Sequence, residues 1–268
     1  IDLIIQSIHE GNSNDIAFTV SKSAINRAEA VASAFAPVLR THPTSEQGEA
    51  EVIVERQIAK VSIAGAGMIG RPGVAAQMFA TLAAASINIQ MISTSEVKVS
   101  CVIDAQDCDR AISLLCQTFN VSSSPLQQSR SLTCSSVPPV RGVALDFNQA
   151  RLAIRQVPDL PGMAAQLFGL LAEKNISVDM IIQSQRCRVI NGIATRDIAF
   201  TVAQADAEDA RTALQNVALV LGCGEVLVDL EIAKVSIVGS GMVGQPGVAA
   251  RLFEALAKEQ INIQMIAT

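Results

Sequence analysis

Apolar residues recur along the chain with two periods, one typical of strands and one typical of helices. Segments of the two kinds follow each other, which predicts a repeating order of strands and helices. Residues 151–157, "RLAIRQV", form a strand-like segment, and Met163, Leu167 and Leu171 then recur at the spacing of a helix with one buried face. Strand-like segments follow at 176–184 and in "RDIAFTV", then a helical segment, "AEDARTALQNVAL", and a last strand at 224–230. The predicted order is β-α-β-β-α-β. This is a ferredoxin-like unit of the α+β class, with one antiparallel sheet and both helices on one face.

The pattern recurs because the chain is internally duplicated. Residues 58–94 and 232–268 are 174 positions apart and identical at 25 of 37 positions, and "IDLIIQS" at 1–7 matches "VDMIIQS" at 178–184. A fainter likeness between "PGMAAQLF" and "PGVAAQMF" relates the units within each copy. The sequence therefore predicts four units and a linker rich in Ser, Pro and Gln. These are a first unit lacking its beginning (1–56), a second (57–120), the linker (121–141), a third with a preceding strand (142–230) and a fourth lacking its end (231–268).

Composition and charge exclude several classes of partner. The 268 residues carry a net charge of −5 without a basic patch, and they include no Trp or Tyr, so we do not expect nucleic-acid binding. No apolar run reaches the ~18 to 20 residues that span a bilayer, so we expect no membrane insertion. Six cysteines form no CxxC pair and neither histidine lies near them, so we expect no metal site and reduced thiols in a cytoplasmic protein. The chain begins at Ile1 in an apolar run, so we also expect sequence upstream.

One motif points to a different function. Gly65, Gly67 and Gly70 have the G-x-G-x-x-G spacing of a loop that closes on a dinucleotide pyrophosphate, and this makes an NAD(P)-dependent oxidoreductase the alternative function. That fold also needs a crossover to a parallel strand that ends in an acidic residue. Here "INIQMIST" (87–94) runs almost directly into "EVKVSCVID", which predicts an antiparallel pair. The sequence shows no catalytic triad, Cys/His pair, H-E-x-x-H or Walker motif, so we predict no catalytic residue in this chain.

Several longer strings resemble one family. The segment "VPDLPGMAAQLFGLLAEKNISVDMIIQS" and the repeated "KVSIVGSGMVGQPGVAARLF" with "INIQMI" resemble ACT domains, and more narrowly the regulatory region of aspartate kinases. The resemblance covers nearly all of the chain except the linker, and four units are similar to a doubled regulatory region. It implies allosteric binding of lysine, threonine or both, in feedback inhibition of an enzyme that phosphorylates L-aspartate with ATP at the start of Lys/Thr/Met biosynthesis.

The same resemblance sets expectations about the parent protein. It implies a kinase domain in the same polypeptide, which would hold ATP and Mg and has no counterpart in these residues, and a homodimer formed through ACT units. No cofactor is expected in the regulatory region itself. A further alternative is a free-standing ACT interaction module whose pockets bind nothing.

The third unit offers groups suited to a free amino acid. The turn at Asp159, Pro161 and Gly162 is predicted to place Pro161 early in a helix, where the free amides of Met163 and Ala164 would bind a carboxylate. Asp159 could receive the ammonium group or instead cap the helix, and both interpretations stay open.

The adjoining strand and the related units complete the predicted sites. Alternation places Asp179 and Gln183 on one face, where Asp179 could pair with a lysine side chain and Gln183 could hydrogen-bond a hydroxyl or amide. The resemblance implies that pockets lie between units. The remaining predicted effector-binding residues are Ser177, Val178, the matching pair Asp2 and Gln6, and the "N-I" pairs Asn88, Ile89, Asn262 and Ile263. The pocket of the first unit is incomplete here, because its Pro-Gly helix is not in the chain.

Overall fold

The structure is a computed structural model of the chain, and it describes most of the residues. The described residues are 4–8, 14–37, 52–68, 71–95, 97–123, 140–185, 187–239, 242 and 245–268, with the backbone alone at 4–8 and 14–15. All strand pairs in this part of the chain are antiparallel, as predicted.

The third unit confirms the predicted order of strands and helices. It consists of β7 (Gln149–Pro158), α4 (Met163–Glu173), β8 (Val178–Gln183), β10 (Ile193–Ala203), α5 (Ala207–Val220) and β11 (Val226–Asp229). One element was not predicted, the short strand β9 (Arg188–Ile190), which pairs with β10. Asn191 and Gly192 join β9 to β10 with φ of 52° and 81°, the positive angles that a tight two-residue hairpin needs.

The second unit has the same order without a final strand among its described residues. It consists of β3 (Ile58–Ala64), α2 (Val74–Ala84), β4 (Met91–Ser95), β5 (Lys98–Asp104) and α3 (Cys108–Phe119). Strand β5 lies between β3 and β4 and pairs with both. The predicted antiparallel pairing of β4 with β5 is therefore confirmed.

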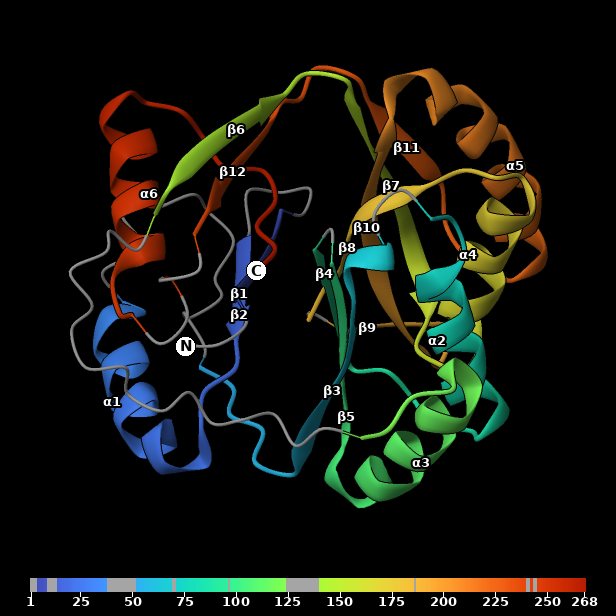
Figure 1. The fold of residues 1–268 in the computed structure, drawn as a ribbon, viewed down its shortest axis with the longest axis horizontal. Coiled ribbons are helices and arrows are strands. Elements are labelled where there is room, and N and C mark those ends of the chain that lie inside the picture. Colours follow the sequence, from blue (N-terminus) through green and yellow to red (C-terminus); the bar gives the residue numbers. More distant parts are fainter. Residues whose placement is uncertain are drawn as a thin grey trace.

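The second and third units join into one eight-stranded sheet. The strand order is β11-β7-β10-β8-β4-β5-β3, with β9 added to β10, and Ser93 of β4 is paired with Ile182 of β8. At this seam the Thr94 hydroxyl donates to the Asp179 carbonyl at 2.9 Å and accepts from the Ile181 amide at 2.8 Å. Helices α2, α3, α4 and α5 cover the same face of the sheet, on the right of Figure 1. Two units of one chain thus share one continuous sheet.

A single hydrophobic core runs under all four of these helices. Its buried residues come from both units, and an aromatic row crosses the boundary from Phe79 of α2 through Phe168 of α4 to Phe200 of β10. The ring centroids are 5.6 Å and 5.3 Å apart, within the range of favourable tilted and edge-on aromatic contacts. The second and third units therefore share one hydrophobic core.

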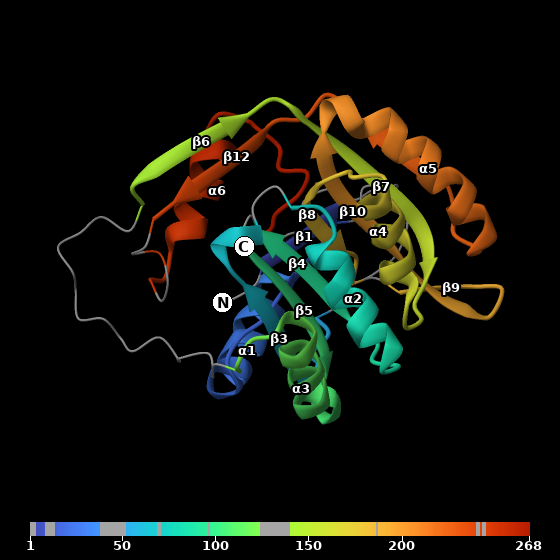
Figure 2. The same ribbon diagram turned by 45° about the vertical axis from the view of Figure 1, so that its right-hand side comes forward.

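The first and fourth units contribute the smaller pieces on the left of Figure 1. The first has β1 (Ile4–Ile8), β2 (Asn14–Phe18) and α1 (Ile25–Phe35), and the fourth has β12 (Lys234–Val238) and α6 (Val248–Lys258). Strand β6 (Gly142–Asp146), which the predicted boundaries place ahead of the third unit, pairs along its length with β12. The third unit is therefore inserted between two strands of the fourth, and β6 and β12 form the link between the two sides in Figures 1 and 2.

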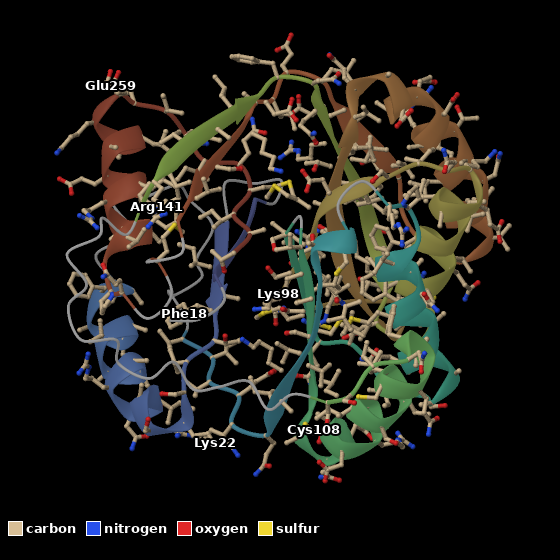
Figure 3. All side chains as sticks on the ribbon, in the orientation of Figure 1. Phe18, Lys22, Lys98, Cys108, Arg141 and Glu259 are labelled. Carbon is tan, nitrogen blue, oxygen red and sulfur yellow. The ribbon has the colours of Figure 1, made fainter. Side chains whose placement is uncertain are left out.

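Residues from the smaller units also cover the helix-free face of the large sheet. Met91, Val102 and Ile182 form a second buried cluster there, against which Ala17 of β2 and Met265 near the C-terminus pack. Lys22 near α1 and Glu259 after α6 lie at the periphery in Figure 3. Within the described ranges no helix is both long and apolar enough to cross a bilayer.

The cysteines in the described part of the chain carry free thiols. Complete burial raises the pKa of the Cys101 thiol far above its ordinary value, and partial burial raises the pKa of Cys223 to about 11. Because the thiolate is the reactive form, both behave as small packed hydrophobic groups.

Thr94→Val should destabilise the pairing of the second and third units. The variant leaves the Asp179 carbonyl and the buried Ile181 amide without the Thr94 hydroxyl, which should lower the free energy of unfolding by about 1–3 kcal/mol. Urea unfolding followed by circular dichroism measures the change. Thr81→Val is the matched control, because the Thr81 hydroxyl bonds only to exposed partners on α2 and α3. Equal small losses in both variants would show that Thr94 does not hold the seam.

Candidate functional site

A small cleft lies where the start of α4 in the third unit faces the segment between α2 and β4 in the second. Eight of the predicted effector-binding residues line it together, namely Asn88, Ile89, Asp159, Pro161, Gly162, Met163, Ala164 and Gln183. Apolar side chains of both units complete the walls, among them Phe79, Leu160 and Ile198. The free space is about 20 Å³, which is roughly enough for one water molecule. An amino acid can therefore enter only if the cleft widens.

The start of α4 gives the cleft its anion-binding character. Gly162 caps the helix in the left-handed conformation, with φ of 96°, and Met163 is the first helical residue. Pro161 thus lies just before the cap, and the prediction that it falls early within the helix was wrong. The first amides of a helix have no acceptor within the helix and can bind a carboxylate, although here the Met163 amide donates to the Leu160 carbonyl at 3.4 Å.

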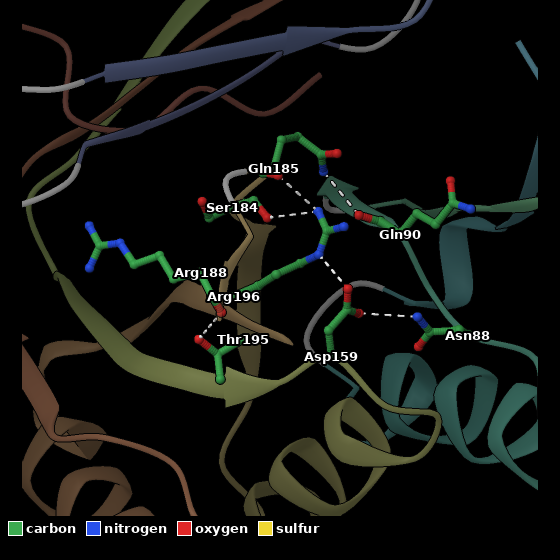
Figure 4. Close-up of polar contacts among 8 residues, drawn as sticks. All are labelled: Asn88, Gln90, Asp159, Ser184, Gln185, Arg188, Thr195 and Arg196. Carbon is green, nitrogen blue, oxygen red and sulfur yellow. Dashed lines mark hydrogen bonds and ion pairs between the residues drawn. The ribbon is translucent and has the colours of Figure 1, made fainter. Parts of the chain in front are cut away.

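Asp159 does not cap α4, since no side chain makes a capping hydrogen bond there. Its carboxylate instead joins the two units, as Figure 4 shows. Arg196 of β10 donates from Nε to Oδ2 at 2.8 Å, and Asn88 of the second unit donates from Nδ2 to Oδ1 at 3.1 Å. The side chains of Arg196 and Asp159 are only 14% and 12% exposed. Both carboxylate oxygens therefore have a partner in the absence of a ligand.

Further hydrogen bonds extend this network to the end of β8. Arg196 Nη1 donates to the carbonyl oxygens of Ser184 and Gln185, and Gln185 Nε2 donates to the Gln90 carbonyl of the second unit (Figure 4). Arg196 was not among the predicted site residues. The sequence does contain one indication of its role. Arg196 is a charged residue within the apolar strand "TRDIAFTV", and a buried guanidinium needs a partner.

Asp179 lies outside the cleft and has a different partner. Its carboxylate forms an ion pair with Lys234 of β12, and both side chains are mostly buried. Its own carbonyl accepts the Thr94 hydroxyl, so Asp179 touches the second, third and fourth units at one point. Ser177 and Val178 do not line the cleft either, and Val178 packs against the shared core.

The other predicted site residues are not brought to the cleft. Asp2 lies outside the described residues, and Gln6 is described only by its backbone in β1. Asn262 and Ile263 lie in the segment after α6, apart from the residues that line the cleft.

The strands around the glycine motif are not arranged as in a dinucleotide-binding fold. Gly65 lies at the end of β3, where its amide donates to the Val97 carbonyl at 2.9 Å, and Gly70 lies outside the described residues. Strand β5 separates β3 from β4, whereas a dinucleotide fold places those two strands side by side. In the described ranges no cluster of three or more His, Cys, Asp or Glu side chains could hold a metal ion.

Comparison with known proteins gives one consistent family. A sequence profile described as "ACT domain" matches residues 61–119, 155–217 and 235–268. The crystal structure of aspartate kinase from Synechocystis superposes with a TM-score of 0.91 at 63% identity, over 100% of this chain and 45% of that one.

Curated relatives match a shorter stretch. Aspartate kinase from Pseudomonas fluorescens is 48% identical over 131 residues, which are 49% of this chain and 30% of that protein. Aspartokinase from Thermus thermophilus is 44% identical over 134 residues, 48% of this chain and 31% of that protein. The present chain therefore spans less than half the length of these relatives.

Asp179→Asn tests whether this carboxylate is structural. The variant removes the carboxylate charge that faces the mostly buried Lys234 ammonium group, so the free energy of unfolding should fall by about 1–3 kcal/mol while ligand affinity of the cleft changes little. Chemical unfolding and calorimetric titration measure the two effects. Asp107→Asn, which breaks the exposed pair with Arg110, is the control and should cost less than about 1 kcal/mol. Loss of ligand binding at unchanged stability would instead make Asp179 a ligand-binding residue.

Proposed function

Because this chain belongs to the ACT domain family, we propose that it is the effector-binding regulatory region of an aspartate kinase. In this proposal it binds lysine, threonine or both and mediates feedback inhibition of the phosphorylation of L-aspartate by ATP.

The cleft between the second and third units is the observation that carries this proposal. The effector carboxylate would bind the amides of Met163 and Ala164 at the start of α4, in place of the 3.4 Å hydrogen bond from the Met163 amide to the Leu160 carbonyl. Its ammonium group would bind carbonyl or carboxylate oxygens, and the amides of Asn88 and Gln183 would contact a polar side chain. These groups come from two units, so only the assembled pair presents them together.

The small volume of the cleft links binding to regulation. With free space of about 20 Å³, the described conformation cannot hold an amino acid, and effector binding favours a conformation in which the two units have moved apart locally. A ligand with different affinities for two states shifts the equilibrium between them. The state that binds the effector would be the one that inhibits the kinase.

The rest of the parent protein follows from the same proposal. A kinase domain of the same polypeptide would bind ATP and Mg, while the regulatory units need no cofactor. The parent enzyme would be cytoplasmic and would form a homodimer through its ACT units. The terminal strands β3 and β11 of the large sheet would be available for such contacts, because open strand edges tend to be paired or covered.

Amino-acid binding should be detectable as stabilisation of the full-length protein. Threonine or lysine at ~100 times its dissociation constant should add about 2.7 kcal/mol to the free energy of unfolding, whereas NADH should add nothing. The region has no Trp or Tyr, so scanning calorimetry is better suited than intrinsic fluorescence. A melting temperature unaffected by either amino acid would contradict the proposal and favour an interaction module with unused pockets.

Self-association should be linked to effector binding. Sedimentation velocity of the full-length protein at tens of micromolar, with and without threonine and lysine, should show a dimer that effectors strengthen. A monomer under every condition would remove the homodimer from the proposal. It would leave the cleft intact, since the second and third units of one chain form it.

A further inference from the structure

The cleft contains one ionisable side chain among its described lining residues, and its charge is already neutralised. That side chain is Asp159, and the Arg196 guanidinium lies behind it with Nε 2.8 Å from Oδ2. Both groups are mostly buried, at 12% and 14% exposure, so water screens neither of them well. The pair gives the cleft a net charge near zero.

Arg196 is held in this position from two sides. Its Nη1 donates to the carbonyl oxygens of Ser184 and Gln185, at 3.4 Å and 3.1 Å, where β8 ends. Asn88 occupies the second oxygen of Asp159 from the opposite unit. Figure 4 shows the guanidinium between the carboxylate and these carbonyl groups. The ion pair is therefore a built feature of the cleft wall.

We propose that Arg196 is a specificity-determining residue that makes the cleft select amino acids with an uncharged side chain over those with a second ammonium group. This inference rests on the proposed function, since it names the class of effector at the same site. An amino acid such as threonine is a zwitterion without net charge and suits a neutral cleft. Lysine brings one further positive charge, which would remain unpaired or would displace Arg196 from Asp159. Either outcome leaves a cation mostly buried without a counter-ion, which is unfavourable.

Removing the guanidinium should change the preference in a defined direction. In Arg196→Gln the Asp159 carboxylate is free to pair with the side-chain ammonium of lysine, so the ratio of lysine to threonine affinity should rise at least about tenfold. In the double variant Asp159→Asn with Arg196→Gln the cleft is neutral again, and the preference for threonine should return. If Arg196 only stabilised the fold, its substitution would lower the affinities for threonine and lysine by the same factor.

The experiment is isothermal titration of threonine and of lysine into the full-length protein, wild type and variants. Arg151→Gln is the matched control, because Arg151 forms a partly buried ion pair with Asp229 at 3.1 Å outside the residues that line the cleft. It should lower stability without changing the ratio of the two affinities. If Arg196→Gln does not fold, Arg196→Lys is the second variant. It keeps the positive charge and should retain the preference for threonine. A preference for lysine in that variant would overturn the proposal.

The outcomes separate this inference from the proposed function. Wild-type protein that binds neither amino acid contradicts both. Wild-type protein that binds both, with an affinity ratio that Arg196→Gln leaves unchanged, contradicts only the role of Arg196. Wild-type protein that prefers lysine also contradicts that role, because the paired carboxylate would then not exclude a second ammonium group.

Discussion

The close approach of helices α2 and α4 is the constraint on which the rest of the structure depends. Each helix starts with a glycine in the left-handed conformation, Gly73 and Gly162, and each glycine lies against an alanine of the other helix. A Cβ atom at Gly73 would be 3.4 Å from that of Ala172, and one at Gly162 would be 3.7 Å from that of Ala83. The contact is reciprocal, since the glycines and the alanines are both 89 positions apart. Glycine is suited to both demands, a positive φ and a short approach.

The shared core and the cleft both follow from this contact. Because the helices lie close together, Phe79 and Phe168 meet beneath them, and β4 and β8 come within hydrogen-bonding distance at the edge of each unit. Each buried side chain of this kind contributes on the order of 1.5–3 kcal/mol, so the two units are far more stable together than apart. The same geometry brings the start of α4 in the third unit beside Asn88 of the second. Each unit thus supplies one wall of the cleft. The affinity for a ligand that bonds to both units therefore depends on the distance between them, and binding of such a ligand changes that distance.

Local patterns were enough to predict the order of strands and helices in the third unit. Periodicity located α4 and α5, and the nearly adjacent segments "INIQMIST" and "EVKVSCVID" predicted the antiparallel pair of β4 with β5. The partner of β6 could not be predicted, because "GVALD" is compatible with either neighbour and the choice of β12 depends on how the third unit is inserted. The cleft residues were found where they belonged to one motif, as at Pro161 and Gly162. Asn88 and Ile89 of the other unit were named through the resemblance, whereas the cations that pair with Asp159 and Asp179 were not found.

Asp159 and Asp179 show why those partners were missed. From the sequence, Asp159 before a helix and Asp179 on the adjoining strand were both predicted to bind an amino-acid ligand, yet each is mostly buried and each already has a cation. Their partners lie 37 and 55 residues further along the chain, on strands that are otherwise apolar. A charge within an apolar strand is costly unless it is paired, so Arg196 in "TRDIAFTV" and Lys234 in "IAKVSI" indicated that two buried carboxylates were needed elsewhere. The cations, rather than the carboxylates, indicated the two ion pairs: Asp159 with Arg196 at the cleft, where Asn88 also joins the units, and Asp179 with Lys234 between the third and fourth units.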